Sequence, residues 1–321
     1  MGVLTQWSNR AAVPPPHRED REVYRLGRMV AGSLIMERLF SRLRQTAPHV
    51  RIVTLEGEAG TGKTLAAQTL HSLGPASGAA FVPCTASRFV MAEVQPLLEE
   101  ARGGTLLLTR VADLTPEQQS RLFDFLEWWE HRSTRDPNGF FPRQIFFSSR
   151  RPLRQLSADG RMRADLCYKL IAIRFVLPPL RERRGDISVL AEHFTVEQGA
   201  MRDKPMRGLY PAALQRLQSH SWPGNVRELE TVISNAVVEC EGQWVRSIDI
   251  AALSPAAARV AEVPAARVKA VAAEDEDPNL DRMIVRHIRA VLTKTGGNKL
   301  RAAQLLGISR STLYRLLESQ V

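Results

Sequence analysis

The fold is decided by one glycine-rich stretch, Gly57-Glu58-Ala59-Gly60-Thr61-Gly62-Lys63-Thr64, which matches the pattern GxxxxGK[ST]. The apolar run from Val50 to Leu55 precedes it and predicts a buried strand, and a helical pattern begins at Lys63. A strand, a glycine loop and a helix in this order predict a phosphate-binding loop. The backbone N–H groups of such a loop and the positive N-terminus of its helix both face phosphate oxygens.

Each part of this loop has an expected role in holding a nucleotide. The glycines permit a tight turn whose backbone approaches the phosphates, so all eight residues are expected to contact the nucleotide. Lys63 would reach the β and γ phosphates, and the Thr64 hydroxyl would hold Mg²⁺ through the nucleotide. An unrelated glycine turn is the alternative, and the strand before the loop and the helix after it argue against that alternative.

Strands and helices alternate around the loop. Apolar runs predict further strands at residues 105–108, 144–148 and 171–177. Helices are expected after Ser33 and after Thr115, where threonine, proline and glutamine stand in the order of a capped helix start. This alternation predicts an α/β fold with a parallel sheet.

Changes in composition divide the chain into five expected parts. Residues 1–24, rich in proline and charge, are expected to be a flexible tail. Residues 25–205 would form the α/β nucleotide-binding core, and the helical pattern of residues 206–250 predicts a lid. Residues 251–278 contain an alanine-rich and acidic linker, and residues 279–321 a small all-α domain.

The charge of the chain indicates an acidic partner. Its 321 residues include 44 basic and 34 acidic side chains, a formal net charge of +10. Eight basic and two acidic side chains fall in residues 279–321, which predicts that this part binds double-stranded DNA. The three isolated cysteines exclude a disulfide framework, and the sequence has no signal-peptide core. No apolar run approaches about 20 residues, so we expect a cytoplasmic protein with no membrane partner.

The last part has the spacing of a helix-turn-helix. Helices are expected at residues 281–293, 298–306 and 310–319, with Gly307 in the turn before the third. In this motif the last helix enters the major groove by its N-terminal residues. The expected DNA contacts are Asn298, Lys299, Arg301, Ser309, Arg310, Ser311, Thr312 and Arg315. A helical cap that binds no DNA is the alternative.

Several motifs resemble those of one family. The stretch from Gly57 to His71 resembles the central AAA+ ATPase domain of NtrC-type bacterial enhancer-binding proteins, which activate sigma-54 RNA polymerase. Residues 103–106 resemble the approach to the Walker B strand, and residues 160–166 resemble the arginine-finger helix. Residues 177–187 and 222–229 resemble two further signatures, of which the second is the lid signature, and the C-terminal part resembles a Fis-type helix-turn-helix.

The resemblance implies roles that the residue pattern alone does not give. The fold would be a P-loop AAA+ core with a helical lid and a Fis-type domain. Arg227 would contact the nucleotide from the lid, and Arg163 and Lys169 would be the two finger candidates that reach into a neighbouring subunit. The family forms rings, normally hexamers, and Fis-type modules usually dimerise, so self-association is expected. RNA polymerase is a further implied partner.

The sequence departs from the family where hydrolysis takes place. The family's Walker B strand ends in Asp-Glu, which hold Mg²⁺ and orient the attacking water, whereas this chain has Thr109 and Arg110. A hydroxyl and a guanidinium cannot do the work of these carboxylates. Asp113 lies beyond the strand and is no evident replacement. Arg110 either neutralises phosphate charge, as a metal would, or is a solvated arginine in a decayed site.

Other family features are also missing. Ser149 and Arg150 replace the sensor I polar pair, and Pro83 aligns with the asparagine that restrains the catalytic glutamate. Lys169 stands at the second finger position and lacks the fork of arginine. Nothing between residues 83 and 102 resembles the GAFTGA loop that contacts the sigma factor.

These departures predict a sequence-specific DNA-binding regulator that binds ATP through an AAA+ domain deficient in hydrolysis, rather than an enzyme. Two alternatives stay open. The chain could be an active ATPase of the sigma-54 system whose carboxylates come from elsewhere, or it could join a mixed ring with an intact paralogous AAA+ regulator. The sequence leaves the Mg²⁺ dependence of nucleotide binding open.

Overall fold

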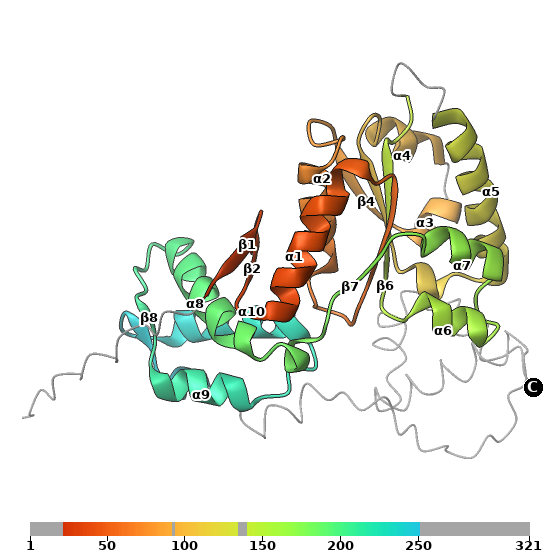
Figure 1. Ribbon diagram of the computed structural model, residues 1–321. Coiled ribbons are helices and arrows are strands. Elements are labelled where there is room, and N and C mark those ends of the chain that lie inside the picture. The colour runs from red at the N-terminus through yellow and green to blue at the C-terminus, as the bar shows by residue number, and fades with distance from the viewer. Residues whose placement is uncertain (1–21, 92–93, 134–139, 251–321) are drawn as a thin grey trace, which may run out of the picture. The chain divides into compact units, whose positions relative to one another are not determined.

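The computed structural model describes residues 22–91, 94–133 and 140–250 (Figure 1). The expected linker and helix-turn-helix, with the DNA contacts assigned to them, lie outside the described residues. So does the expected tail, apart from residues 22–24. The described residues belong to one compact unit that contains the core and the lid.

The core is built on a five-stranded parallel sheet, as the alternating pattern predicts. Its strand order is β4-β5-β6-β3-β7, and all neighbouring strands run parallel. The strands are β3 (Ile52–Glu56), β4 (Phe81–Thr85), β5 (Thr105–Thr109), β6 (Gln144–Ser149) and β7 (Arg174–Val176). The apolar side chains at the centre of the sheet are buried on both faces, which explains their continuous apolar runs.

Helices cover both faces of this sheet, as Figure 1 shows. Leu107 and Phe146 pack in one apolar cluster with residues of α1 (Leu34–Thr46) and α2 (Lys63–Leu73). Leu106, Leu108 and Phe147, at alternating positions, pack in a second cluster under the helices of the other face. Those helices are α3 (Ala86–Met91), α4 (Val94–Glu100), α5 (Pro116–Ser133), α6 (Leu153–Ala158) and α7 (Ala164–Leu170).

Two elements of the core differ from the expected pattern. The expected strand at residues 171–177 is only three residues long, because α7 continues to Leu170 and Ile171 caps it. Strand β4 was not predicted, because its sequence Phe-Val-Pro-Cys-Thr includes a proline and shows no alternation of apolar and polar residues. A short antiparallel hairpin of β1 (Tyr24–Leu26) and β2 (Met29–Ala31) precedes α1 and was also not expected.

The lid is a helical unit with its own apolar cluster. Its helices are α8 (Gly185–Ala200), α9 (Pro211–Ser219) and α10 (Asn225–Glu239), and β8 (Gly208–Leu209) pairs with β9 (Trp244–Val245). Ile187 and Leu190 of α8 are buried in the same cluster as Trp222 and Leu229. The sequence predicts a lid that begins at residue 206. In the structure α8, which begins at Gly185, packs with the lid helices that follow it.

The described ranges contain no helix that is long and apolar enough to cross a bilayer. The three cysteines, Cys84, Cys167 and Cys240, are buried and unpaired. Burial raises the pKa of the Cys84 and Cys167 thiols, so these two side chains behave as small apolar groups in the core.

Candidate nucleotide-binding site

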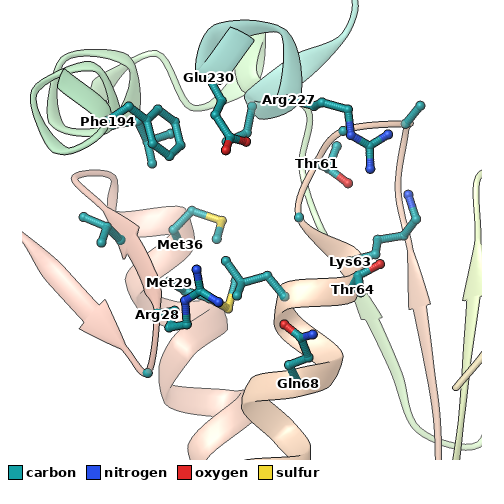
Figure 2. A pocket seen from close by; sticks show the side chains of 18 of the residues that line it. Arg28, Met29, Met36, Thr61, Lys63, Thr64, Gln68, Phe194, Arg227 and Glu230 are labelled. Atoms are coloured by element: carbon teal, nitrogen blue, oxygen red, sulfur yellow. The ribbon is translucent and has the colours of Figure 1, made fainter. Parts of the chain in front are cut away.

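The phosphate loop opens into a cavity of about 690 Å³ between the core and the lid. A cavity of this size is in the usual range for sites that take a small molecule or cofactor. Figure 2 shows Met29, Met36 and Phe194 at one end of it and Lys63 and Arg227 at the other. One end of the cavity therefore carries apolar side chains together with Arg28, and the other end is cationic, a combination that suits a nucleotide base and its phosphates.

The phosphate loop joins β3 to α2, as its sequence context predicts. Gly57 and Gly60 have φ angles of 147° and 77°, a conformation that favours glycine. A side chain at Gly60 would also lie 2.0 Å from the carbonyl oxygen of Gly224 in the lid. The loop therefore needs glycine both for its backbone conformation and for its close approach to the lid.

Lys63 is folded back on this loop. Its Nζ donates to the carbonyl oxygens of Gly57 and Glu58, each at 2.6 Å. Burial, followed by the nearby guanidinium groups of Arg150 and Arg227, lowers the pKa of Lys63 to about 8. These causes show that three cations converge at the phosphate end of the cavity, where an anionic ligand would relieve their mutual repulsion.

The loop is bound to the lid through Glu58 and Asn225. Arg181 donates to both carboxylate oxygens of Glu58, at 2.5 and 2.8 Å, and the Asn225 amide donates to the same group at 3.1 Å. The hydrogen bonds from Arg181 and then from Asn225 lower the pKa of Glu58 to about 2. The Asn225 amide also donates to the carbonyl oxygen of Ala59, and its oxygen accepts from the Leu180 N–H. Asn225 lies in the lid signature, but no role was expected for it from the sequence.

Arg183 provides a second connection that sequence analysis missed. It is 4% exposed, and it donates to the Thr61 carbonyl oxygen at 2.9 Å and to Asp186 at 3.4 Å. Asp186 in turn accepts from the backbone N–H groups of Gly32 and Ser33. Burial lowers the pKa of Arg183, and the Asp186 carboxylate opposes that effect. This buried pair joins the phosphate loop, the lid and the segment before α1.

Arg227, the expected sensor arginine, lines the cavity from α10. The backbone N–H groups of Val226 and Arg227 donate to the Gly60 carbonyl oxygen, at 3.0 and 3.3 Å. The start of α10 is thereby fixed against the loop, which places the Arg227 side chain beside Lys63 (Figure 2). Thr64, the expected metal contact, also lines the cavity.

The end of β5 carries no acidic group. Thr109 donates its hydroxyl to the Cys84 carbonyl oxygen at 3.2 Å, and its backbone register places it opposite Thr85 of β4 and Ser148 of β6. Arg110 follows with a φ of 63°, lines the cavity and pairs with Asp113 at 2.8 Å. The family implies Mg²⁺ at this strand end, and this donor set does not fit that ion, which prefers carboxylate oxygens.

The two finger candidates lie outside the cavity, at helix α7. Arg163 precedes α7 and donates to Asp165 at 2.6 Å and to the Ser120 hydroxyl at 2.7 Å. Lys169 donates to Glu130 at 2.6 Å and also pairs with Glu127. Both side chains are therefore held by neighbouring groups of their own chain.

Three family models match successive parts of the chain. The sigma-54 interaction domain matches residues 30–180, the AAA+ ATPase lid domain matches residues 181–265, and the Fis family of bacterial regulatory proteins matches residues 286–318. The change from the first model to the second falls close to the start of α8, in agreement with the packing of that helix in the lid cluster.

Relatives and solved structures agree with these matches. The transcriptional regulatory protein ZraR of Salmonella typhi is 32% identical over 309 residues, which cover 90% of this chain and 68% of ZraR. The transcriptional regulator NtrC of Azospirillum brasilense is 31% identical over 348 residues, covering 95% and 71%. A crystal structure of NtrX from Brucella abortus in complex with ATP is 27% identical, with a TM-score of 0.58, and covers 91% of this chain and 69% of NtrX.

The phosphate loop, the lid contacts and the order of the three matched domains lead to one assignment. The chain belongs to the sigma-54-dependent transcriptional activators of the NtrC and ZraR type, which join an AAA+ domain to a Fis-type helix-turn-helix.

Proposed function

We propose that this member of the family is a DNA-bound regulator whose AAA+ domain binds ATP and does not turn it over at the rate of a working motor. One observation carries the proposal. The phosphate loop is complete and its lysine lines the cavity, whereas the strand end that should activate water presents the Thr109 hydroxyl and the Arg110 guanidinium. Binding and hydrolysis need different groups, and only the groups for binding are present at this site.

ATP binding is supported by the cavity and by the relatives. The cationic end of the cavity matches a polyphosphate, and its apolar end matches a base. The NtrX structures in complex with ATP and with ADP have the same fold and are 27% and 26% identical to this chain. We propose that residues 57–64 and Arg227 hold the nucleotide in the same general way.

DNA binding belongs to the C-terminal part that the Fis family model matches. The proposed contacts are Asn298, Lys299, Arg301, Ser309, Arg310, Ser311, Thr312 and Arg315. The protein would act in the cytoplasm, where its DNA is, and would associate as a dimer or a hexamer. No sequence between residues 83 and 102 resembles the loop that contacts the sigma factor in the family, so contact with RNA polymerase, if made, would use another surface.

The test is a phosphate-release assay on the full chain with saturating ATP, beside a direct ATP-binding measurement. We expect binding without release of phosphate above the level of the Lys63→Ala variant. Turnover that Lys63→Ala abolishes would refute the proposal and favour the alternative of an active ATPase. Failure of the wild type to bind ATP would refute its first half.

A mixed ring with an intact paralogue is favoured by one observation. The Arg163 side chain is 41% exposed beside α7, outside the chain's own cavity, so a phosphate of a neighbouring subunit could displace its present partner Asp165. Co-purification with such a paralogue, and loss of the paralogue's turnover when this chain carries Arg163→Ala, would support the mixed ring. A particle made only of this chain, unaffected by mixing, would exclude it.

A further inference from the structure

The cavity is far more basic than the chain as a whole. Seven of the side chains that line it are lysine or arginine and two are acidic. The acidic residues, Glu197 and Glu230, lie on the lid helices α8 and α10. Figure 2 shows Glu230 projecting from the lid, across the cavity from Thr64. Among the described residues, the strand ends contribute no carboxylate to the cavity; they contribute Thr109, Arg110, Ser148, Ser149 and Arg150.

The oxygen ligands that a magnesium ion needs are missing at this end. Thr64, Thr109, Ser148 and Ser149 offer only neutral hydroxyl groups there, and not the carboxylate that protein sites for Mg²⁺ use. The carboxylate of Asp113 is paired with Arg110, and Asp113 does not line the cavity. Within the part of the chain that the structure describes, no three acidic, histidine or cysteine side chains converge as a metal site. A divalent cation would also meet Lys63, Arg110 and Arg150, which repel it.

Arginine can replace the metal as the counter-charge of a polyphosphate. A guanidinium binds two phosphate oxygens at once and keeps its charge at any physiological pH. Arg110 can leave Asp113 and bind a phosphate at small cost, because its pair with Asp113 is exposed and exposed ion pairs are weak. Arg150 lies close enough to affect the charge of Lys63 and follows the neighbouring strand β6.

We infer that this site takes ATP as the metal-free tetra-anion, with Arg110 and Arg150 supplying the positive charge that Mg²⁺ supplies elsewhere in the family. The inference rests on the proposed binding of ATP and specifies its ionic form. It predicts that Mg²⁺ opposes ATP binding here, whereas the resemblance implies that Mg²⁺ accompanies ATP in the family. Mg²⁺ removes two negative charges from the nucleotide, so it should weaken binding, on the order of tenfold when one close charge interaction is lost.

The experiment is a titration of the full chain with ATP by calorimetry, once in excess EDTA and once in excess Mg²⁺ at equal ionic strength. Binding that is about tenfold tighter in EDTA supports the inference. Binding that is equal in the two buffers, or that requires Mg²⁺, overturns it and leaves the proposed ATP binding intact. An absence of binding in both buffers overturns both, so the two failures are distinguishable.

Variants locate the effect. Arg110→Ala should weaken binding in EDTA about tenfold. Arg121→Ala is the matched control, because Arg121 also pairs with a carboxylate on the surface, Glu117 at 2.7 Å, and does not line the cavity. An equal loss in both variants would overturn the inference.

A variant designed to bind Mg²⁺ completes the test, because its expected result is a gain of Mg²⁺ response and not a loss of ATP affinity. Thr109→Asp combined with Arg110→Glu restores two carboxylates at the strand end and should reverse the preference, so that Mg²⁺ now tightens ATP binding. Circular dichroism checks that this variant is folded. If the folded variant responds to Mg²⁺ as the wild type does, the strand end does not decide the ionic form and the inference fails.

Discussion

Replacing Asn225 should separate the lid from the phosphate loop. Asn225 is fully buried, has a φ of 55° and begins α10. Its side chain accepts from the Leu180 N–H at 2.7 Å and donates to Glu58 at 3.1 Å and to the Ala59 carbonyl oxygen at 3.0 Å. Asn225→Ala removes these three hydrogen bonds without changing the charge of the cavity.

The size of the effect follows from these contacts. A buried N–H left without its acceptor, here that of Leu180, costs about 1–3 kcal/mol. The lost hydrogen bonds to the Ala59 carbonyl and to the exposed Glu58 carboxylate each cost at least about 1 kcal/mol. Alanine at a positive φ adds about 1 kcal/mol of backbone strain that asparagine tolerates better. We therefore expect Asn225→Ala to lower the free energy of unfolding by about 4 kcal/mol, and ATP affinity to fall because the loop loses its support.

Asn225→Gly isolates the backbone contribution. It loses the same three hydrogen bonds, but glycine adopts a positive φ without strain. The glycine variant should therefore be more stable than the alanine variant, by about 0.5–1 kcal/mol, although alanine is the better residue inside a helix. This reversed order is specific to a residue held in the left-handed conformation.

The assay is equilibrium urea unfolding followed by circular dichroism, with ATP titrations on the same variants. Asn235→Ala is the control, because Asn235 is exposed on the same helix, and its stability should change by no more than about 0.5 kcal/mol. A loss below about 1 kcal/mol for Asn225→Ala, or a glycine variant less stable than the alanine variant, would show that Asn225 does not hold the lid in this way.

Three further predictions follow from the loop. Gly60→Ala would place a methyl group 2.0 Å from the Gly224 carbonyl oxygen, so ATP binding should fall at least tenfold in a titration, while Gly78→Ala, which meets nothing within 4 Å, should bind normally. Because the folded pKa of Glu58 is lowered to about 2, its pairing stabilises the fold fully above about pH 4.5 and is lost as the pH falls toward 2. The pair is exposed, so this contribution is about 1 kcal/mol, and an acid titration of stability that is identical for Glu58→Gln would contradict it. With the pKa of Lys63 near 8, metal-free ATP affinity should fall about eightfold from pH 7.5 to 9, and a curve that is flat over this range would contradict the assigned pKa.

Local signals predicted the parts of the fold that depend on near neighbours. Thr115 and Gln118 form the expected reciprocal cap of α5, with hydrogen bonds of 3.0 and 3.3 Å. The phosphate loop lies between a strand and a helix as its pattern requires. Strands β5 and β6 are predictable because both of their faces are buried and the residues at their centres are apolar.

Strand β4 shows what such signals miss. It lies at the edge of the sheet, where exposed Pro83 needs no hydrogen-bonding partner for its nitrogen. Its register places Thr85 opposite Thr109 and Pro83 opposite Leu107. The residue of β4 beside the last residue of β5 is thus Thr85. An edge strand of mixed polarity gives no pattern that fixes this register.

The contacts that join the lid to the phosphate loop could not be predicted from the sequence for a different reason. Asn225 contacts Glu58 over 167 positions of sequence, and Arg183 contacts Thr61 over 122. Neither contact has a local pattern, because each depends on how the lid meets the core. The lid signature at residues 222–229 indicated that the lid contributes to the site. Only the packing shows which side chains connect the lid to the phosphate loop.

The two finger candidates differ in how readily they could serve a neighbouring subunit. Lys169 is 15% exposed and pairs with two carboxylates, Glu127 and Glu130, so a phosphate would have to displace both of these contacts. Arg163 is 41% exposed and pairs mainly with Asp165, two residues away, and exposed pairs of this kind contribute about 0–1 kcal/mol. An anionic phosphate from another subunit would therefore compete more readily for Arg163 than for Lys169. In a mixed ring, Arg163 is thus the better candidate for contact with the neighbouring site.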